Sequence, residues 1–192
     1  MAAGEAPHEQ DYAVLERGDG TVTLRFSRQL PHPQDKVWRA LTQAEHLAAW
    51  FPTTIEGDLA AAGAPLTFGF RHVPMPPMDG RAISWDPPRL LEYLWGDETL
   101  RFELTPRASG TLLSFTATFA ETGRAARDGA GWHACLDELG YALDGLPVPW
   151  TTDERWRLVN PGYVSRFGPD AATVGPPQEW EETYGPADTG SA

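Results

Sequence analysis

The stretch WHACLDELGYALDGL, residues 132–146, decides the fold of this 192-residue chain. Its leucines recur at spacings of three, four and three residues, so they form one apolar stripe along a helix: Leu136, Leu139, Leu143 and Leu146. Gly145 and Pro147 end the helix. An amphipathic helix needs an apolar surface to cover, so the sequence before it should supply a sheet.

Short strands separated by turn residues fill the chain before this helix. They are expected at residues 54–59, 66–71, 80–85, 90–95, 99–105 and 111–119. Separators such as PMPPMD and DPPR contain residues that interrupt strands, and the short connections predict an antiparallel meander. In LRFELT, residues 100–105, apolar and polar side chains alternate strictly. We therefore predict an α+β fold in which a curved sheet of six to seven strands wraps around one long helix near the carboxyl end.

One further strand and two short helices are expected earlier in the chain. Residues 21–30, TVTLRFSRQL, alternate and place their apolar side chains, with Arg28 at the end of the row, on one face. Two short helices then lie between Pro33 and Pro52. Thr42 and Glu45 have the spacing of a capping box and are expected to separate these helices.

The two ends of the chain lie outside the predicted domain, which spans residues 21–147. Residues 1–20 are expected to be a polar tail in which the group 12–15 could add an edge strand. Residues 148–168 predict a helical extension, interrupted near its proline, that packs outside the sheet or over a cavity mouth. Residues 169–192 are rich in proline, glycine and acidic side chains and are expected to form a loose acidic tail.

The charge of the chain narrows the choice of partners. Its net charge is -12 and its pI is about 4.7, so the surface repels phosphate backbones and anionic lipid head groups. Nucleic acid is therefore a poor candidate partner. No apolar run is long enough for a membrane span, and no secretory signal opens the chain. We expect a soluble, cytoplasmic protein that could form a homodimer.

Cofactor and metal motifs are missing from the sequence. The single cysteine, Cys135, excludes an internal disulfide and a multi-cysteine metal site, and a buried apolar role is expected for it. No glycine-rich phosphate loop, nucleophile elbow or ligand-spaced histidine pair occurs. We therefore predict neither a metal nor a cofactor.

Three strings resemble the START and Bet v 1-like superfamily, also called SRPBCC. They are PHPQDKVWRALTQAEHLAAWF (31–51), GRAISWDPPRLLEYLWG (80–96) and GAGWHACLDEL (129–139). In order and spacing they are similar to the branch named for the activator of heat-shock protein 90 ATPase. The resemblance implies a helix-grip fold with a deep apolar cavity between the sheet and the last helix. It carries over no catalytic residue.

In such a fold the default ligand site is this cavity. Single aromatic residues more often pack as core, but as a set these side chains exceed what a small core fills densely. The expected wall comprises Trp38, Trp50, Phe51, Phe68, Phe70, Arg81, Trp85, Tyr93, Trp95, Phe102, Phe115, Trp132 and Leu136. Arg81 shares the strand parity of Trp85 and either enters the cavity to hold a ligand anion or lies in water, and the second is favoured.

His133, Asp137 and Tyr141 are the nearest approach to a catalytic group. Their spacing of four residues places them on one face of the last helix, and a carboxylate beside an imidazole is the arrangement of a general base. That face points away from the leucine stripe, so we expect it to be solvated or packed at an edge. His32 and His72 lie in loops beside prolines, where exposure is expected.

Three functions remain open on this evidence. The first is the binding of a small hydrophobic molecule, such as a lipid, a polyketide or an aromatic metabolite, in the cavity. The second is an enzyme of the cyclase or aromatase kind, which needs two titratable groups that point into the cavity. The third is a co-chaperone or stress-response role, which the name of the branch suggests.

Overall fold

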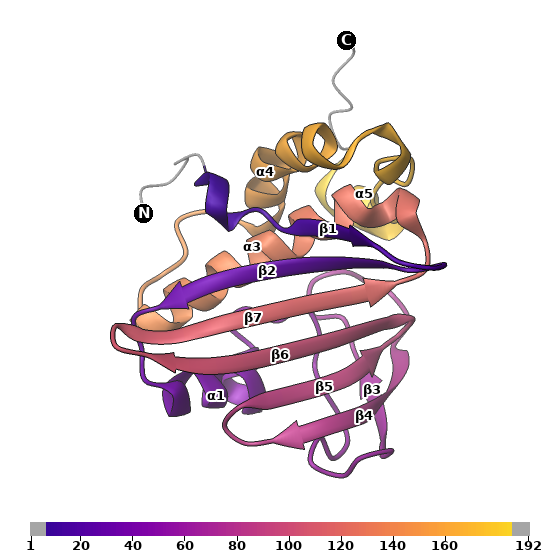
Figure 1. Ribbon diagram of the computed structural model, residues 1–192. Helices are drawn as coiled ribbons and strands as arrows, with labels where there is room; N and C mark the ends of the chain where they lie inside the picture. The colour runs from indigo at the N-terminus through magenta and orange to yellow at the C-terminus, as the bar shows by residue number, and fades with distance from the viewer. Residues whose placement is uncertain (1–6, 186–192) are drawn as a thin grey trace.

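The computed structural model describes residues 7–185 and is built on one antiparallel sheet (Figure 1). The sheet has seven strands in the order β1-β2-β7-β6-β5-β4-β3. The strands are β1 (Val14–Arg17), β2 (Val22–Leu30), β3 (Pro65–Phe68), β4 (Met78–Asp86), β5 (Leu90–Trp95), β6 (Glu98–Arg107) and β7 (Gly110–Phe119). The α+β helix-grip fold that the sequence predicts is confirmed.

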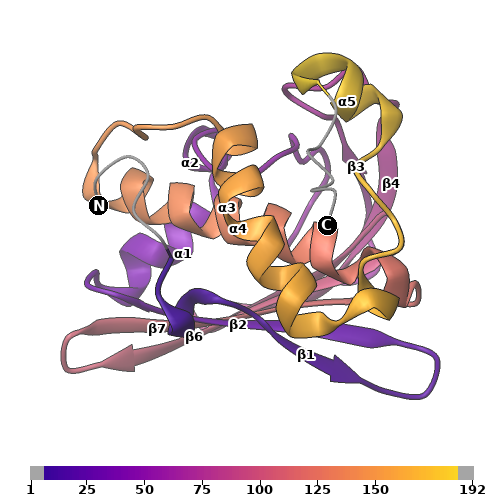
Figure 2. The same cartoon turned by 90° about the horizontal axis from the view of Figure 1, so that it is seen from above.

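The helices gather on the concave side of this sheet (Figure 2). They are α1 (Gln34–Thr42), α2 (Ala44–Leu47), α3 (Ala125–Asp144), α4 (Thr152–Phe167) and α5 (Gln178–Tyr184), with short turns η1 (Glu9–Asp11), η2 (Thr122–Arg124) and η3 (Pro169–Ala171). α3 lies across the sheet, and α4 packs against α3 on the side where β1 forms the edge of the sheet (Figure 1). The long helix is therefore covered on two sides.

The alternating sequence of the central strands builds a dry aromatic layer beneath α3. Phe115 of β7 is paired in register with Phe26 of β2 and Phe102 of β6. The three rings stack, with centroids 5.7 Å apart for Phe26 and Phe115 and 4.6 Å apart for Phe102 and Phe115. Each of these rings is at most 1% exposed, and full burial of a phenylalanine contributes about 1.5–3 kcal/mol.

A β-bulge in β4 explains why the strand parity expected for Arg81 is wrong. Ala82 pairs with Tyr93 and Ser84 pairs with Glu92, so Ile83 is the extra residue. An extra residue exchanges the two faces of a strand beyond it. Trp85 therefore points inward and packs edge-on against Trp38, whereas Arg81 lies on the outer face and is exposed.

α3 begins earlier than the leucine stripe predicts, because the glycine-spaced segment before Trp132 is helical. Gly129 faces α4, and a Cβ atom there would lie only 2.8 Å from Cδ1 of Tyr163. The glycine thus lets the two helices approach closely. Gly145 adopts φ 68° and ends α3 as expected.

Two local predictions in the amino-terminal half are wrong. No strand forms at residues 54–59. Only the isolated bridge Glu56↔Thr67 lies there, and a second bridge, Thr53↔Phe70, lies just before it. The expected capping box is also missing, because Thr42 is still helical and its hydroxyl donates to the carbonyl of Trp38 at 2.8 Å. The residue between the two helices is Gln43, which makes no side-chain cap.

Both expected tails contain ordered elements within the described residues. β1 adds an edge strand to β2, as the group 12–15 suggested, and residues 169–185 contain η3 and α5. α4 continues through Pro161 without the expected interruption. Residues 1–6 and 186–192 of the expected tails lie outside the described part. No helix in residues 7–185 has the length and apolar character needed to cross a membrane.

Candidate functional site

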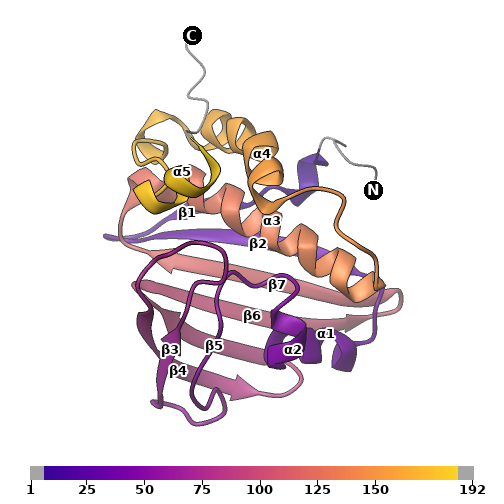
Figure 3. The ribbon, with the colours of Figure 1, turned by 180° about the vertical axis from the view of Figure 1, so that it is seen from behind.

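A cavity of ≈ 430 Å³ opens beside the first half of α3. Its walls come from four parts of the chain: the end of α2 with the segment after it, the loop before β4, the β5–β6 turn, and α3 with α4 and α5. Figure 3 shows α5 on the same side of the molecule as β3 and β4. Trp180 of α5 lines the cavity. The site therefore joins the domain core to the carboxyl-terminal extension.

Five tryptophans are the largest side chains of the apolar wall. The indole N–H groups of four of them are already bound by the protein: Trp50 donates to the Ala40 carbonyl, Trp95 to Thr53, Trp132 to Glu98 and Trp156 to the Arg127 carbonyl. The fifth, Trp180 of α5, packs against Trp156 with ring centroids 5.2 Å apart. Because these four N–H groups have partners in the protein, the four indoles offer mainly their ring faces to a ligand.

The structure divides the expected wall residues into three groups. Five line the cavity: Trp50, Phe51, Phe70, Trp95 and Trp132. Seven others fill the core instead or pack at its edge: Trp38, Phe68, Trp85, Tyr93, Phe102, Phe115 and Leu136. The last, Arg81, is exposed on the outer face. Four cavity residues were not expected from the sequence: Glu98, Asp128, Glu138 and Trp180. Glu98 lies at the β5–β6 turn, Asp128 and Glu138 lie on α3 outside the leucine stripe, and Trp180 lies in the expected tail.

Glu98 and Asp128 form a carboxylate pair at one end of the cavity, and Arg124 joins them. Arg124 Nη2 lies 3.2 Å from Glu98 Oε1, and its Nε lies 3.1 Å from Asp128 Oδ2. Glu98 is 4% exposed. Burial, with a smaller effect from the nearby Asp128 charge, raises the pKa of Glu98 to about 8. Glu98 is thus a carboxylic acid that keeps a proton near neutral pH.

Glu138 lines the same cavity but differs from Glu98 and Asp128, because it contacts a neutral hydroxyl and not an arginine. Its Oε1 accepts a hydrogen bond from the Thr152 hydroxyl at 2.5 Å. Among residues 7–185 no cationic side chain forms an ion pair with it. Burial raises its pKa to about 7. A largely desolvated carboxylate without a cation is costly to ionise, and a cationic ligand would lower that cost.

Cys135 also lines the cavity, one helical turn before Glu138. The thiol is buried, and its burial raises its pKa well above the usual range. A thiol in this state is a poor nucleophile, so Cys135 serves as part of the apolar wall. Within residues 7–185, no group of three His, Cys, Asp or Glu side chains is placed to hold a metal ion.

On the face of α3 opposite the cavity, His133 and Asp137 are buried, so the expectation that they are solvated is wrong. His133 is 0% exposed and Asp137 is 7% exposed, because α4 covers both. Arg155 of α4 donates to Asp137 Oδ2 from Nε at 2.7 Å, and Arg28 Nη2 lies 4.0 Å from Asp137 Oδ1. The edge-packing alternative is the one that the contacts support.

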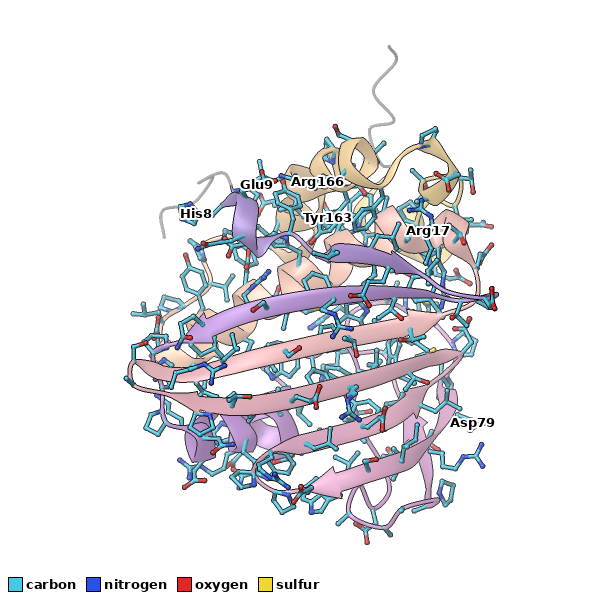
Figure 4. The ribbon with its side chains drawn as sticks, in the orientation of Figure 1. His8, Glu9, Arg17, Asp79, Tyr163 and Arg166 are labelled. Atoms are coloured by element: carbon cyan, nitrogen blue, oxygen red, sulfur yellow. The ribbon has the colours of Figure 1, made fainter. Side chains whose placement is uncertain are left out.

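Tyr163 completes this buried network and links it to the amino-terminal segment. Its hydroxyl accepts the Ala13 N–H at 3.1 Å and lies 3.0 Å from His133 Nδ1. Arg166, one turn later on α4, pairs with Glu9 of η1 (Figure 4). Burial lowers the pKa of His133 to about 2, so the imidazole is neutral. The group points away from the cavity and ties α3 to α4 and β1.

The fold and the cavity together define a helix-grip protein with a partly open site beside the first half of its long helix. Residues 31–144 match the family model described as "Activator of Hsp90 ATPase homolog 1-like protein". The chain therefore belongs to this family, within the SRPBCC superfamily, as the three sequence strings suggested. None of the curated proteins matches it.

Solved structures share this architecture at low sequence identity. A conserved protein of unknown function from Enterococcus faecalis aligns with a TM-score of 0.65 and 20% identity, over 80% of this chain and 89% of its own. CalU16 from Micromonospora echinospora aligns with a TM-score of 0.58 and 22% identity, over 77% and 88%. A Bordetella parapertussis protein reaches 0.63 and 25%, over 75% and 85%. These likenesses support the fold.

Proposed function

We propose that this protein binds a small, largely apolar molecule in the cavity between α3, the β5–β6 turn and α5. The observation that carries the proposal is the wall itself. Five of the eight tryptophans of the chain line one cavity of ≈ 430 Å³. Ligand sites typically have about 300–1,000 Å³ of volume, mostly apolar walls and a few polar groups.

The chain offers a direct test through two glycines of α3. Gly131 lines the cavity, and a Cβ atom there meets nothing within 4 Å. Gly131→Phe should therefore fill the cavity with a ring while the helix stays intact. Gly140 also has open space at its Cβ but does not line the cavity, so Gly140→Phe is the matched control.

Titration with the neutral fluorescent probe N-phenyl-1-naphthylamine measures the result. The wild type and Gly140→Phe should bind the probe alike, and Gly131→Phe should bind it at least about 10-fold more weakly, a loss of about 1.4 kcal/mol. Native mass spectrometry of protein purified without added ligand gives a second readout. Equal binding by all three proteins, or no binding by any, would contradict the proposal.

A second candidate function is acid–base catalysis on the bound molecule, of the cyclase or aromatase kind. The observation that favours it is the pair Glu98 and Glu138, two cavity carboxyls whose pKa values burial raises to about 8 and about 7. Groups with pKa values near the working pH are effective proton donors and acceptors. Turnover of a polyketide-type substrate should then be lost in Glu98→Gln with binding retained, and unchanged turnover in Glu98→Gln/Glu138→Gln would remove this candidate.

A further inference from the structure

We infer that the ligand of this cavity carries a protonated amine, and that this amine forms an ion pair with Glu138 beside the tryptophans of the wall. This inference rests on the proposed function and adds the chemical class of the ligand. It starts from a difference among the acidic residues of the lining. Asp97, Glu98 and Asp128 contact Arg124, and Asp153 contacts Arg157, whereas Glu138 contacts no cationic side chain of the described residues.

Both arginines of the lining are committed to the end of the cavity where Asp128 lies. Arg124 contacts Asp97, Glu98 and Asp128, and Arg127 Nε lies 2.6 Å from Asp128 Oδ1. Arg127 also donates to the Gly175 carbonyl. Neither guanidinium is therefore available to Glu138, and a ligand anion would meet no free arginine at this wall.

Glu138 has the surroundings of a receptor for a cation. It lines the cavity, it is half-buried, and its hydrogen bond comes from a neutral hydroxyl, that of the exposed Thr152. Asp153 lies on the same wall, paired with Arg157. A bound ammonium would supply the charge-assisted hydrogen bond that residues 7–185 do not provide to Glu138.

The aromatic wall favours the same ligand. Trp156 and Trp180 pack together on the side of the cavity that α4 and α5 form, and both line it with Glu138. Tryptophan faces attract cations through the ring quadrupole, and the attraction is larger where water is displaced. An apolar ring system with an attached ammonium satisfies both parts of the wall, the rings and the carboxylate.

Three naphthalene probes of nearly equal size separate charge from shape: 1-naphthylmethylamine, which is a cation, 1-naphthalenemethanol, which is neutral, and 1-naphthoate, which is an anion. Calorimetric titration at pH 8 should give the tightest binding to the amine, by about 10-fold over the alcohol, with the naphthoate weakest. Glu138→Gln should remove the preference for the amine and leave the binding of the alcohol unchanged. Glu121→Gln, which removes the same charge from an exposed residue outside the cavity, should keep it.

The outcomes distinguish the inference from the proposed function. If the alcohol binds as tightly as the amine, or if Glu138→Gln keeps the preference, the inference is overturned while binding in the cavity stands. If none of the three probes binds, both are overturned. Circular dichroism of Glu138→Gln verifies its fold, and no loss of structure is expected because the substitution removes a desolvated charge.

Discussion

Two long faces of α3 carry polar side chains, which are buried on the face toward α4 and only partly buried on the face toward the cavity. On the face toward α4, Asp137 Oδ2 accepts a hydrogen bond from Arg155 Nε at 2.7 Å, and His133 Nδ1 lies 3.0 Å from the Tyr163 hydroxyl. On the face toward the cavity, Glu138 has a hydroxyl as its partner and no cation among the described residues. The comparison teaches that burial alone does not mark a binding group. A buried charge that the protein itself neutralises holds the fold together, and one that faces an open cavity is available to a ligand.

The largest expected effect comes from breaking the partnered face. Asp137→Ala removes the carboxylate that pairs with the buried side chains of Arg155 and Arg28. Because two buried positive charges then lose their partner, the free energy of unfolding should fall by about 3–5 kcal/mol. Urea denaturation measures it. The control is Asp170→Ala, which breaks an exposed pair with Arg17 and should cost less than about 1 kcal/mol. Similar small losses in both variants would show that the network does not hold α4 on α3.

The second effect is a dependence of stability on pH that the cavity face produces. Burial raises the pKa of Glu98 to about 8 and that of Glu138 to about 7, so both bind a proton more tightly in the folded chain than in the unfolded chain. Their stabilisation is complete below about pH 4.5 and is lost as the pH rises through these values. We expect the free energy of unfolding to fall by about 2 kcal/mol between pH 6.5 and 8.

His133 acts in the opposite direction and in a different range. Burial lowers the pKa of His133 from 6.5 to about 2. Its contribution to the free energy of unfolding is therefore complete above about pH 6.5 and is lost as the pH falls from 6.5 toward 2. The window from pH 6.5 to 8 therefore reports the cavity carboxyls. Denaturation at several pH values should show a shallower decline in Glu138→Gln and in Glu98→Gln, and an unchanged slope in both would contradict the assignment.

The smallest effect concerns the close approach of the two helices. In Gly129→Ala, the new Cβ atom would lie only 2.8 Å from Tyr163 Cδ1. We expect the cost of this overpacking to outweigh the gain in helix propensity. The expected net loss is about 1 kcal/mol by thermal unfolding. Gly140→Ala, which meets open space, should stabilise the chain slightly instead. A gain in both variants would mean that α4 moves away without cost.

The sequence predicts the face of α3 toward the sheet better than the face toward α4. The leucine stripe and the strand alternation follow from a simple period, so they place Trp132 and Phe115 correctly on the inside. A period cannot reveal that α4 covers His133 and Asp137, because this depends on a contact with residues about 20 positions later. It also fails at the bulge around Ile83, where one extra residue reverses the faces and turns Arg81 outward.

The indole signals of the eight tryptophans test the central claim most directly, because they lie both inside and outside the cavity. In a titration of ¹⁵N-labelled protein with 1-naphthylmethylamine, the signals of the cavity group should shift: Trp50, Trp95, Trp132, Trp156 and Trp180. Trp38, Trp85 and Trp150 should keep their positions, since they do not line it. Shifts confined to the second group, or no shift at saturating probe, would contradict a ligand site in this cavity.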